Sequence, residues 1–425
     1  MSAGAPLTAV LCGAGNRGLA AYGAYALHHP DELRFVAVAE PDPRRRARFA
    51  AQHGIPAECQ FATWEELLAQ GRIADLCFNT TQDRLHLPVT LAALRAGYHV
   101  LLEKPLAPTL DQTLALVAAA EQSGRVVQVC HVLRYTPFFA TLHAILRSGR
   151  LGQIVTVEHR ENVAFWHMAH SYVRGHWRNQ ALSSPMILAK CCHDLDLLVW
   201  NLDSLVAQLV STGGLRHFRP EHAPPGATAR CTDPCPAGAT CPFDARRIYL
   251  DPARAGWPVT VISEDLTPEA RRRALEHGPW GRCVYRCDND VVDHQTVNMV
   301  LEDGTNVTLI MHGHAHEESR AMRYDGSRAT LRGLFTARMG VIELHDHLTG
   351  HRETITIPPG ASGHGGGDFG VVRAFLSAVR EGRPGLTGAR AALESHLLAF
   401  AAEESRLKQV VVDMRRFRAQ MSHRA

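Results

Sequence analysis

Lysine is nearly absent from this chain of 425 residues. Only Lys104, Lys190 and Lys408 are lysines, so 42 of the 45 basic residues are arginines. Arginine keeps its proton in proteins, whereas a lysine can lose it when its surroundings lower its pKa. A lysine retained against this bias is therefore expected where a side chain must exchange a proton.

The sequence also lacks a strong net charge and any long hydrophobic run. Its net charge is only +3, whereas nucleic-acid binders carry a clustered basic excess. No apolar stretch approaches the roughly 18–20 residues that cross a bilayer, and no basic segment precedes an apolar one at the amino terminus. We therefore expect neither a nucleic-acid nor a membrane partner, and a cytoplasmic protein with reduced cysteines.

Short apolar runs alternate with helical patterns over residues 1–135. This alternation predicts an α/β domain with a doubly wound parallel sheet and helices on both faces. The predicted helices include Pro43–His53 and Leu85–Ala96. The predicted strands are Leu7–Cys12, Arg34–Ala39, Asp75–Asn79, Tyr98–Leu102 and Val126–Cys130.

Residues 136–425 change to period-two alternation. This pattern predicts an α+β domain with a large, mostly antiparallel sheet that has one open face. A Pro-, Cys- and Arg-rich stretch at about 213–290 has the character of an insertion. The predicted helices are Phe138–Ser148, one across Pro185–Trp200, Phe369–Arg380 and Ala389–Lys408. The predicted strands are Ile154–His159, Val206–Ser211, Thr296–Leu301, Val307–His312 and the short Val410–Asp413.

The motif Gly13-x-Gly15-x-x-Gly18 follows the first predicted strand and opens a helix. Glycines there let the backbone turn and approach a pyrophosphate, which the helix amides bind. Glu40, at the end of the second strand, is placed to accept hydrogen bonds from ribose hydroxyls and to repel a 2′-phosphate. NAD is therefore favoured over NADP, although the arginines at 44–46 follow closely and offer a phosphate site instead.

The segment Glu103-Lys104-Pro105 ends another strand of the predicted parallel sheet. Ligands of open α/β sheets bind at the carboxyl ends of the strands. Lys104 is thus expected near a nicotinamide, where partial burial and the cation of the oxidised cofactor would lower its pKa. The alternative is a surface ammonium paired with Glu103. The predicted cofactor-binding residues are Gly13, Gly15, Asn16, Arg17, Gly18, Glu40, Thr80, Glu103 and Lys104.

The motif Lys190-Cys-Cys-His193-Asp194-Leu-Asp196 places a second rare lysine near a histidine. On one continuous helix Lys190, His193 and Asp194 would share a face. A histidine beside a lysine can serve as an acid–base pair. The alternative is a core helix whose histidine has only structural partners.

Together these motifs resemble the Gfo/Idh/MocA oxidoreductase family, which includes glucose–fructose oxidoreductase and inositol dehydrogenase. The resemblance covers nearly the whole chain, through Gly363–Asp368 and the tail Ser395–Arg406. It implies an amino-terminal Rossmann domain (1–135) that binds NAD(P), and a domain for substrate binding and oligomerisation (136–425). It also implies a homodimer or homotetramer, active-site roles for Lys104 and His193, and a site role for Asp196.

One position departs from the family pattern. Many of its dehydrogenases carry Asp four residues before the motif histidine, and this chain has Ala189 there. Our hypothesis is that His193 takes the hydroxyl proton while Lys104 and Lys190 polarise the oxygen. The predicted catalytic residues are Lys104, His193 and Lys190.

Aromatic and arginine residues crowd the segment 166–179, where the resemblance places substrate-facing side chains. Aromatic faces and guanidinium forks suit a sugar ring, including an anionic one. The alternative is a polar loop that solvates the sheet edge. The predicted substrate-binding residues are Arg134, Tyr135, His167, Tyr172, Arg174, Trp177, Arg178, Asp194 and Asp196.

Five of the eleven cysteines fall in the insertion. Thiols converging from two segments suit a tetrahedral structural Zn²⁺ in a stretch without an obvious core. Unligated thiols, an iron–sulfur cluster or a disulfide are the alternatives. The predicted ligands are Cys231, Cys235, Cys241 and Cys287, with Cys283 competing for the fourth place.

The predicted function is NAD-dependent oxidation or reduction at a secondary hydroxyl of a sugar, cyclitol or sugar derivative. Two alternatives stay open. A glycosidase would use the same parts by oxidising a hydroxyl transiently, eliminating the aglycone and reducing the ring again. A sensor would bind NAD or sugar without catalysis.

Overall fold

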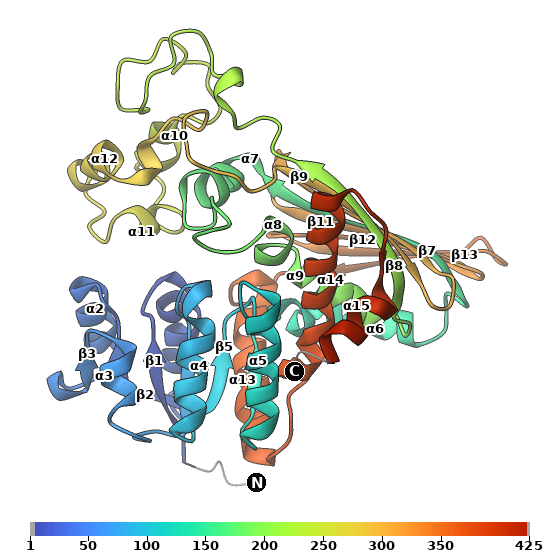
Figure 1. Ribbon diagram of the computed structural model, residues 1–425, viewed down its shortest axis with the longest axis horizontal. Coiled ribbons are helices and arrows are strands. Elements are labelled where there is room, and N and C mark those ends of the chain that lie inside the picture. Colours follow the sequence, from blue (N-terminus) through green and yellow to red (C-terminus); the bar gives the residue numbers. More distant parts are fainter. Residues whose placement is uncertain (1–4, 423–425) are drawn as a thin grey trace.

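Two β-sheets form the framework of the protein in this computed structural model, which describes residues 5–422 (Figure 1). The first sheet has six parallel strands, and the second has nine strands that are mostly antiparallel. The predicted fold class is confirmed: a doubly wound α/β domain is joined to an α+β domain with a large sheet. None of the helices in the described residues is long and apolar enough to cross a membrane.

The first sheet has the strand order β3-β2-β1-β4-β5-β6, which reverses direction between β1 and β4. Ligands of such sheets bind at that reversal, outside the carboxyl ends of the strands. Its strands are β1 (Leu7–Cys12), β2 (Leu33–Ala39), β3 (Gln60–Phe61), β4 (Leu76–Asn79), β5 (His99–Leu102) and β6 (Val127–Val129). Its helices are α1 (Ala24–His28), α2 (Pro43–His53), α3 (Trp64–Leu68), α4 (His86–Arg95) and α5 (Leu110–Gln122), with the helical segment Arg17–Gly23 before α1.

The register of the first sheet aligns the strand ends in one row. Cys12 pairs with Ala39 on one side and Asn79 on the other, and the row continues through Leu102 to Val129. The residues that come next in the chain therefore share one edge of the sheet. They are Gly13, Glu40, Thr80, Glu103 and Cys130.

The second sheet has the order β14-β13-β12-β11-β7-β10-β9-β8-β15. All neighbours are antiparallel except β7 and β10. The four strands β11 to β14 were not predicted from the sequence. The strands are β7 (Ile154–Ala164), β8 (Val206–Gly214), β9 (His294–Leu301), β10 (Asn306–Ala315), β11 (Ser319–Gly326), β12 (Ala329–Thr336), β13 (Gly340–Asp346), β14 (Arg352–Ile357) and β15 (Val412–Asp413).

The helix predicted across Pro185–Trp200 is broken in two, which corrects the sequence analysis. It consists of α8 (Met186–Ala189) and α9 (Cys192–Asn201), with Lys190 and Cys191 between them. The break lets Lys190 turn toward carboxylates of the second sheet. The other helices of this half are α6 (Pro137–Arg147), α7 (Phe165–His167) with the helical segment Met168–Arg174, α14 (Ala389–Lys408) and α15 (Met414–Ser422).

The insertion lies between β8 and β9 and contains α10 (Ala245–Tyr249), α11 (Val259–Ile262) and α12 (Pro268–His277). It has a small core of its own, in which Tyr249, Leu275 and Trp280 are buried. This core was not predicted from the sequence. Figure 1 shows these helices on the side of the molecule where α2 lies.

Helix α13 (Gly367–Glu381) returns the chain to the first sheet. Its Val371, Val372 and Phe375 are fully buried in the same cluster as Leu11 and Phe78 of β1 and β4. A segment from the predicted second domain therefore completes the first. Helix α14 contacts both α5 and β8, so it joins the two halves.

Candidate functional site

A glycine turn after β1 forms the first part of the site. Gly13 has φ +97°, and a Cβ there would lie 2.7 Å from the Thr80 carbonyl oxygen. A Cβ on Gly18 would lie 2.3 Å from the Gly13 oxygen, whereas no atom of residues 5–422 lies within 4 Å of one placed on Gly15. The Thr80 hydroxyl donates to the Gly13 oxygen at 2.5 Å. The turn is thus closed beneath and open above Gly15, as a pyrophosphate cradle requires.

Glu40 lies beside this turn at the end of β2. It is 7% exposed, and its carboxylate accepts from the amide nitrogens of Ala14 (2.8 Å) and Asp42 (3.1 Å). Each oxygen keeps a lone pair for a further donor. The predicted ribose contact therefore fits this position. Asn16, also predicted here, is exposed at the start of the following helical segment.

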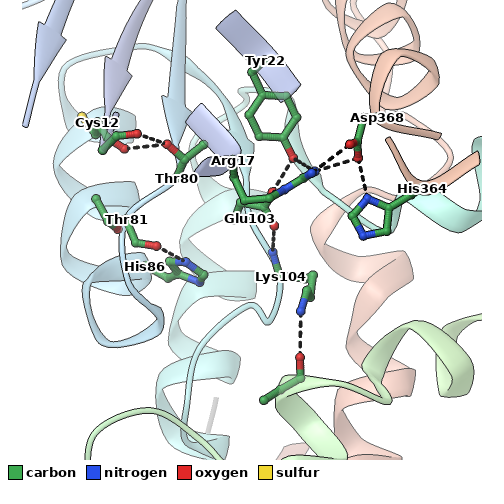
Figure 2. Close-up of polar contacts among 12 residues, drawn as sticks. Cys12, Arg17, Tyr22, Thr80, Thr81, His86, Glu103, Lys104, His364 and Asp368 are labelled. Atoms are coloured by element: carbon green, nitrogen blue, oxygen red, sulfur yellow. Dashed lines mark hydrogen bonds and ion pairs between the residues drawn. The ribbon is translucent and has the colours of Figure 1, made fainter. Parts of the chain in front are cut away.

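Arg17 and Glu103, both predicted to bind cofactor, bind each other (Figure 2). Arg17 Nε donates to Glu103 at 2.6 Å, and both Nη atoms donate to Asp368 at 2.9 and 2.8 Å. Tyr22 donates to Glu103 at 2.5 Å, and His364 pairs with Asp368 at 2.9 Å. The amino end of α13 is thereby tied to the glycine turn.

Burial and pairing fix the charges of this network. Burial by itself would raise the pKa of Glu103 and of Asp368, but Arg17 holds both below their ordinary values. The Arg17 pKa is raised by the same carboxylates against the effect of burial. The network is therefore a fixed set of ions whose role is to hold the site in shape. Tyr22 and Asp368 were not among the predicted site residues.

Lys104 follows β5 and points across to the second domain. Its Nζ donates to the backbone oxygen of Ala189 at 2.7 Å (Figure 2). Ala189 is the position at which the family pattern has an aspartate, so a carbonyl oxygen here orients the ammonium. Lys104 is half-buried, and the alternative of a surface ammonium paired with Glu103 does not describe this position.

His193 of α9 faces the first domain near Lys104. It is 5% exposed, and its Nδ1 has no hydrogen-bond partner among residues 5–422. Burial and the positive charge of Lys104 lower its pKa well below the ordinary histidine value. The imidazole is therefore neutral at physiological pH, and its unpartnered Nδ1 can accept or donate a hydrogen bond according to the tautomer.

His131, which sequence reasoning missed, packs against His193 with ring centroids 5.7 Å apart. It follows β6 at the same sheet edge and is fully buried. Within the described chain neither ring nitrogen has a hydrogen-bond partner, although such burial costs free energy. Burial, Arg134 and Lys104 hold the His131 pKa well below its ordinary value.

Lys190 does not pair with His193, contrary to the shared helix face expected for them. Its Nζ lies 3.2 Å from Glu161 of β7 and 3.0 Å from Glu318. Although burial opposes it, these two carboxylates raise the pKa of Lys190 above its ordinary value. Lys190 therefore stays charged in this arrangement, which gives no support to proton release, and its predicted catalytic role stays a prediction.

Asp194, a predicted substrate contact, is fully buried and faces the sheet. It accepts from His159 at 2.8 Å and from Arg320 at 2.9 Å, and Arg320 also reaches Glu161 at 2.6 Å. Despite burial, Arg320 and His159 hold the Asp194 pKa below its ordinary value. Asp194 therefore anchors α9 on the sheet.

Two further predicted substrate residues bind each other. Arg134 donates to both oxygens of Asp196 at 2.7 and 2.6 Å, and both side chains are buried. Tyr135 next to them shares a hydrogen bond of 3.0 Å with Thr387. In this arrangement the pair joins α9 to the segment after β6, and its contact with substrate stays a prediction.

Three predicted substrate residues gather around Lys190 and the domain boundary. His167 pairs with Glu318 at 2.6 Å, and the buried Tyr172 lies close to the Lys190 charge. Trp177 Nε1 donates to Asp83 of the first domain at 3.2 Å. The contact of these three side chains with substrate stays a prediction.

Arg174 and Arg178 contact the base of the insertion; full burial argues against a substrate role for Arg174, and that of Arg178 stays a prediction. Arg174 is 0% exposed and donates to the backbone oxygens of Arg282 and Phe243. Arg178 forms two hydrogen bonds with Asp288. Abundant arginine made these positions resemble an anion site, but their guanidinium groups hold loop backbone and a surface carboxylate.

The insertion cysteines are free thiols, as are all eleven cysteines, every one of which lies in the described residues. Cys231 accepts from Arg174 at 3.5 Å, and the Cys287 thiol donates to the Cys283 oxygen at 3.3 Å. Among residues 5–422 no three His, Cys, Asp or Glu side chains are arranged to hold a metal ion. The predicted structural zinc has no support in this arrangement and stays a prediction.

Fold and site together define a dinucleotide-binding protein of two domains, in which Lys104 of the first bonds to the Ala189 oxygen of the second and His193 lies within reach of its charge. Residues 7–131 match the model of an oxidoreductase family described by its NAD-binding Rossmann fold, and residues 144–414 match the C-terminal alpha/beta domain of the same family. The chain belongs to this Gfo/Idh/MocA oxidoreductase family, and the resemblance inferred from its motifs is confirmed.

Two similar curated proteins are named for the compounds 1,5-anhydro-D-fructose and inositol. The 1,5-anhydro-D-fructose reductase of Ensifer adhaerens is 30% identical over 181 residues, which are 41% of this chain and 51% of that protein. Inositol 2-dehydrogenase 4 of Saccharopolyspora erythraea is 32% identical over 200 residues, 45% of this chain and 52% of that protein. The chain thus spans about half the length of the curated relatives it matches.

Solved structures share the complete fold at low sequence identity. A levoglucosan dehydrogenase in complex with NADH and levoglucosan superposes with a TM-score of 0.71 at 17% identity, over 96% of this chain and 99% of that one. An aldose-aldose oxidoreductase from Caulobacter crescentus gives 0.67 at 14% identity, over 96% and 99% of the chains. At such identities the likeness establishes the fold alone.

Proposed function

We propose that this protein oxidises or reduces a secondary hydroxyl of a sugar, cyclitol or related polyol with NAD(H). The observation that carries the proposal is Lys104 at the carboxyl edge of the parallel sheet, bonded to the Ala189 oxygen of the other half and near enough to His193 for its charge to lower the pKa of that imidazole. The glycine turn and Glu40 fit the pyrophosphate and the ribose of a dinucleotide. When bound, the nicotinamide would supply hydride exchange with the substrate carbon.

The chain's own residues then handle the proton. The neutral imidazole of His193 accepts the hydroxyl proton during oxidation and returns it during reduction. The Lys104 ammonium, oriented by the Ala189 oxygen, donates a hydrogen bond to the reacting oxygen and stabilises negative charge on it. The ion network of Arg17, Glu103 and Asp368 holds the segment after β5, which carries Lys104, in place.

The charges near the aromatic side chains favour a neutral polyol over an anionic sugar. Two cations, Lys190 and Arg320, are paired there with three acids, Glu161, Glu318 and Asp194, and burial raises the pKa of Glu161 to about 7. A cation already paired in this way offers little attraction to a further anion. The names of the two curated relatives, which concern inositol and an anhydro sugar, support the same substrate class.

The experiment is a substrate panel with the purified protein. NAD is mixed with cyclitols, aldoses and anhydro sugars, and NADH is followed by its absorbance; NADH is also mixed with the matching ketones. The proposal predicts net NADH formation with at least one neutral polyol. Release of a phenol from a phenyl glycoside without net NADH would instead establish the glycosidase. Binding of NADH without any hydride exchange across the panel would contradict both enzymes.

We also propose that two copies associate through the outer face of the second sheet. Alternate residues of β10 and β12 turn away from the core there, and they include Ile310 and Leu334, the latter 44% exposed. The family resemblance implies that the same sheet of a second copy covers this face.

A further inference from the structure

The arginines that follow Glu40 are engaged by the insertion. Arg45 Nε lies 3.1 Å from one oxygen of Glu264, and Arg48 Nη1 lies 2.5 Å from the other. Glu264 stands between α11 and α12, far along the chain from α2. Its side chain is 15% exposed and that of Arg45 32%. The two ion pairs therefore connect the insertion to the first domain, and their side chains are partly exposed to solvent.

A third arginine of this run is also engaged. Arg46 Nη1 donates to the backbone oxygen of Glu40 at 2.5 Å. Arginines at this place in a Rossmann domain are the groups that accept a 2′-phosphate, because a guanidinium fork binds phosphate through two hydrogen bonds. In this protein such a phosphate would have to displace Glu264 from Arg45. It would also have to approach the buried carboxylate of Glu40.

We propose that the insertion takes part in coenzyme choice. Glu264 withdraws Arg45 and Arg48 from the ribose edge, and together with Glu40 it selects the dinucleotide that lacks a 2′-phosphate. The inference rests on the proposed function, since it concerns the same cofactor site. It assigns a specificity-determining residue to a segment that contributes no part of the glycine turn.

The test is Glu264→Gln, which keeps the shape of the side chain and removes its charge. Equilibrium binding of NADH and NADPH is measured by nucleotide fluorescence, so no substrate is needed. We expect the ratio of the NADPH to the NADH dissociation constant to fall by about tenfold, which corresponds to about 1.4 kcal/mol, because a guanidinium released from Glu264 can bind the 2′-phosphate. Adding Arg45→Ala to this variant should reverse most of the change.

Glu269→Gln is the matched control, because Glu269 is an exposed acid at the start of α12 in the same insertion. It should leave the ratio unchanged. An unchanged ratio in Glu264→Gln, with NADH still bound, overturns the inference; failure of the unaltered protein to bind either nucleotide overturns the proposed function instead. Should Glu264→Gln not fold, Arg45→Ala alone tests the inference. NADPH binding as weak as in the unaltered protein supports it, whereas weaker NADPH binding overturns it, because Arg45 would then already bind the 2′-phosphate.

Discussion

At the scale of single residues, the neighbours of each lysine determine what it can do. Lys104 has a backbone oxygen as its partner and a neutral imidazole near it. Lys190 has two carboxylates within 3.2 Å, which keep it charged. Lys104 is therefore able to act on a substrate, whereas Lys190 is a structural cation.

Replacing Lys190 tests this division. Lys190→Met leaves Glu161, which is 1% exposed, with one cation fewer, so the free energy of unfolding should fall by about 2–3 kcal/mol. Lys190→Arg keeps the charge and should lose less. Denaturation by urea measures both. Lys408→Met is the control, because Lys408 forms an exposed pair with Glu404 that contributes about 0.5 kcal/mol or less. Equal stability of the two methionine variants would contradict the account.

Local motifs in the sequence indicate candidate site residues, but they do not indicate the partners of those residues in the fold. Lys104, His193 and Glu40 stand at strand and helix ends whose motifs are local, and their roles stay predictions; Glu40 lies beside the glycine turn, and Lys104 bonds to the Ala189 oxygen. Arg174 and Asp194 were assigned to substrate, but their partners lie on segments distant in sequence, such as Phe243 and Arg320. His131 carried no motif, and only its position after β6 could have marked it.

At the scale of elements, local signals explain the accurate predictions. Helix α2 begins at its predicted residue because the Asp42 side chain accepts from the amides of Arg44 and Arg45. It ends at Gly54, whose φ of +63° suits a residue without Cβ. Strand β11 was hard to recognise because a charged residue, Arg320, occupies one of its core-facing positions. Tertiary partners, which the sequence does not display, make that burial possible.

The glycine turn allows a prediction that separates cofactor binding from folding. Gly15→Ala meets no atom of the described chain within 4 Å, so its melting temperature should equal that of the unaltered protein. Its methyl group would occupy the open side of the cradle, so NADH binding should weaken by about tenfold or more. Gly18→Ala should lose both stability and binding, because its Cβ would meet the Gly13 oxygen at 2.3 Å.

The melting temperature and the NADH dissociation constant are measured on both variants. Gly256→Ala in the insertion is the control, since its site is equally open, and it should change neither quantity. NADH binding by Gly15→Ala as tight as that of the unaltered protein would show that the turn is not the pyrophosphate site.

At the scale of the whole molecule, the site is assembled from parts far apart in the chain. Arg17 near the amino end binds Asp368 near the carboxyl end, and helix α13 packs on the first sheet. The boundary predicted at residue 135 could not show this return, because no local pattern assigns α13 to either sheet. Lys104 and His193 likewise come from different halves of the chain, and helix α14, which contacts both α5 and α9, joins those halves.

The rate of NADH formation by Lys104→Ala and by His193→Ala, with the best polyol from the panel, tests the central claim most directly. Lys408→Ala and His351→Ala, at exposed positions, are the matched controls. The account predicts that each active-site variant loses about 10²- to 10⁴-fold in turnover, the range typical of proton-transfer groups, while NADH affinity stays within about threefold. Turnover by both variants at the rate of the controls would contradict it.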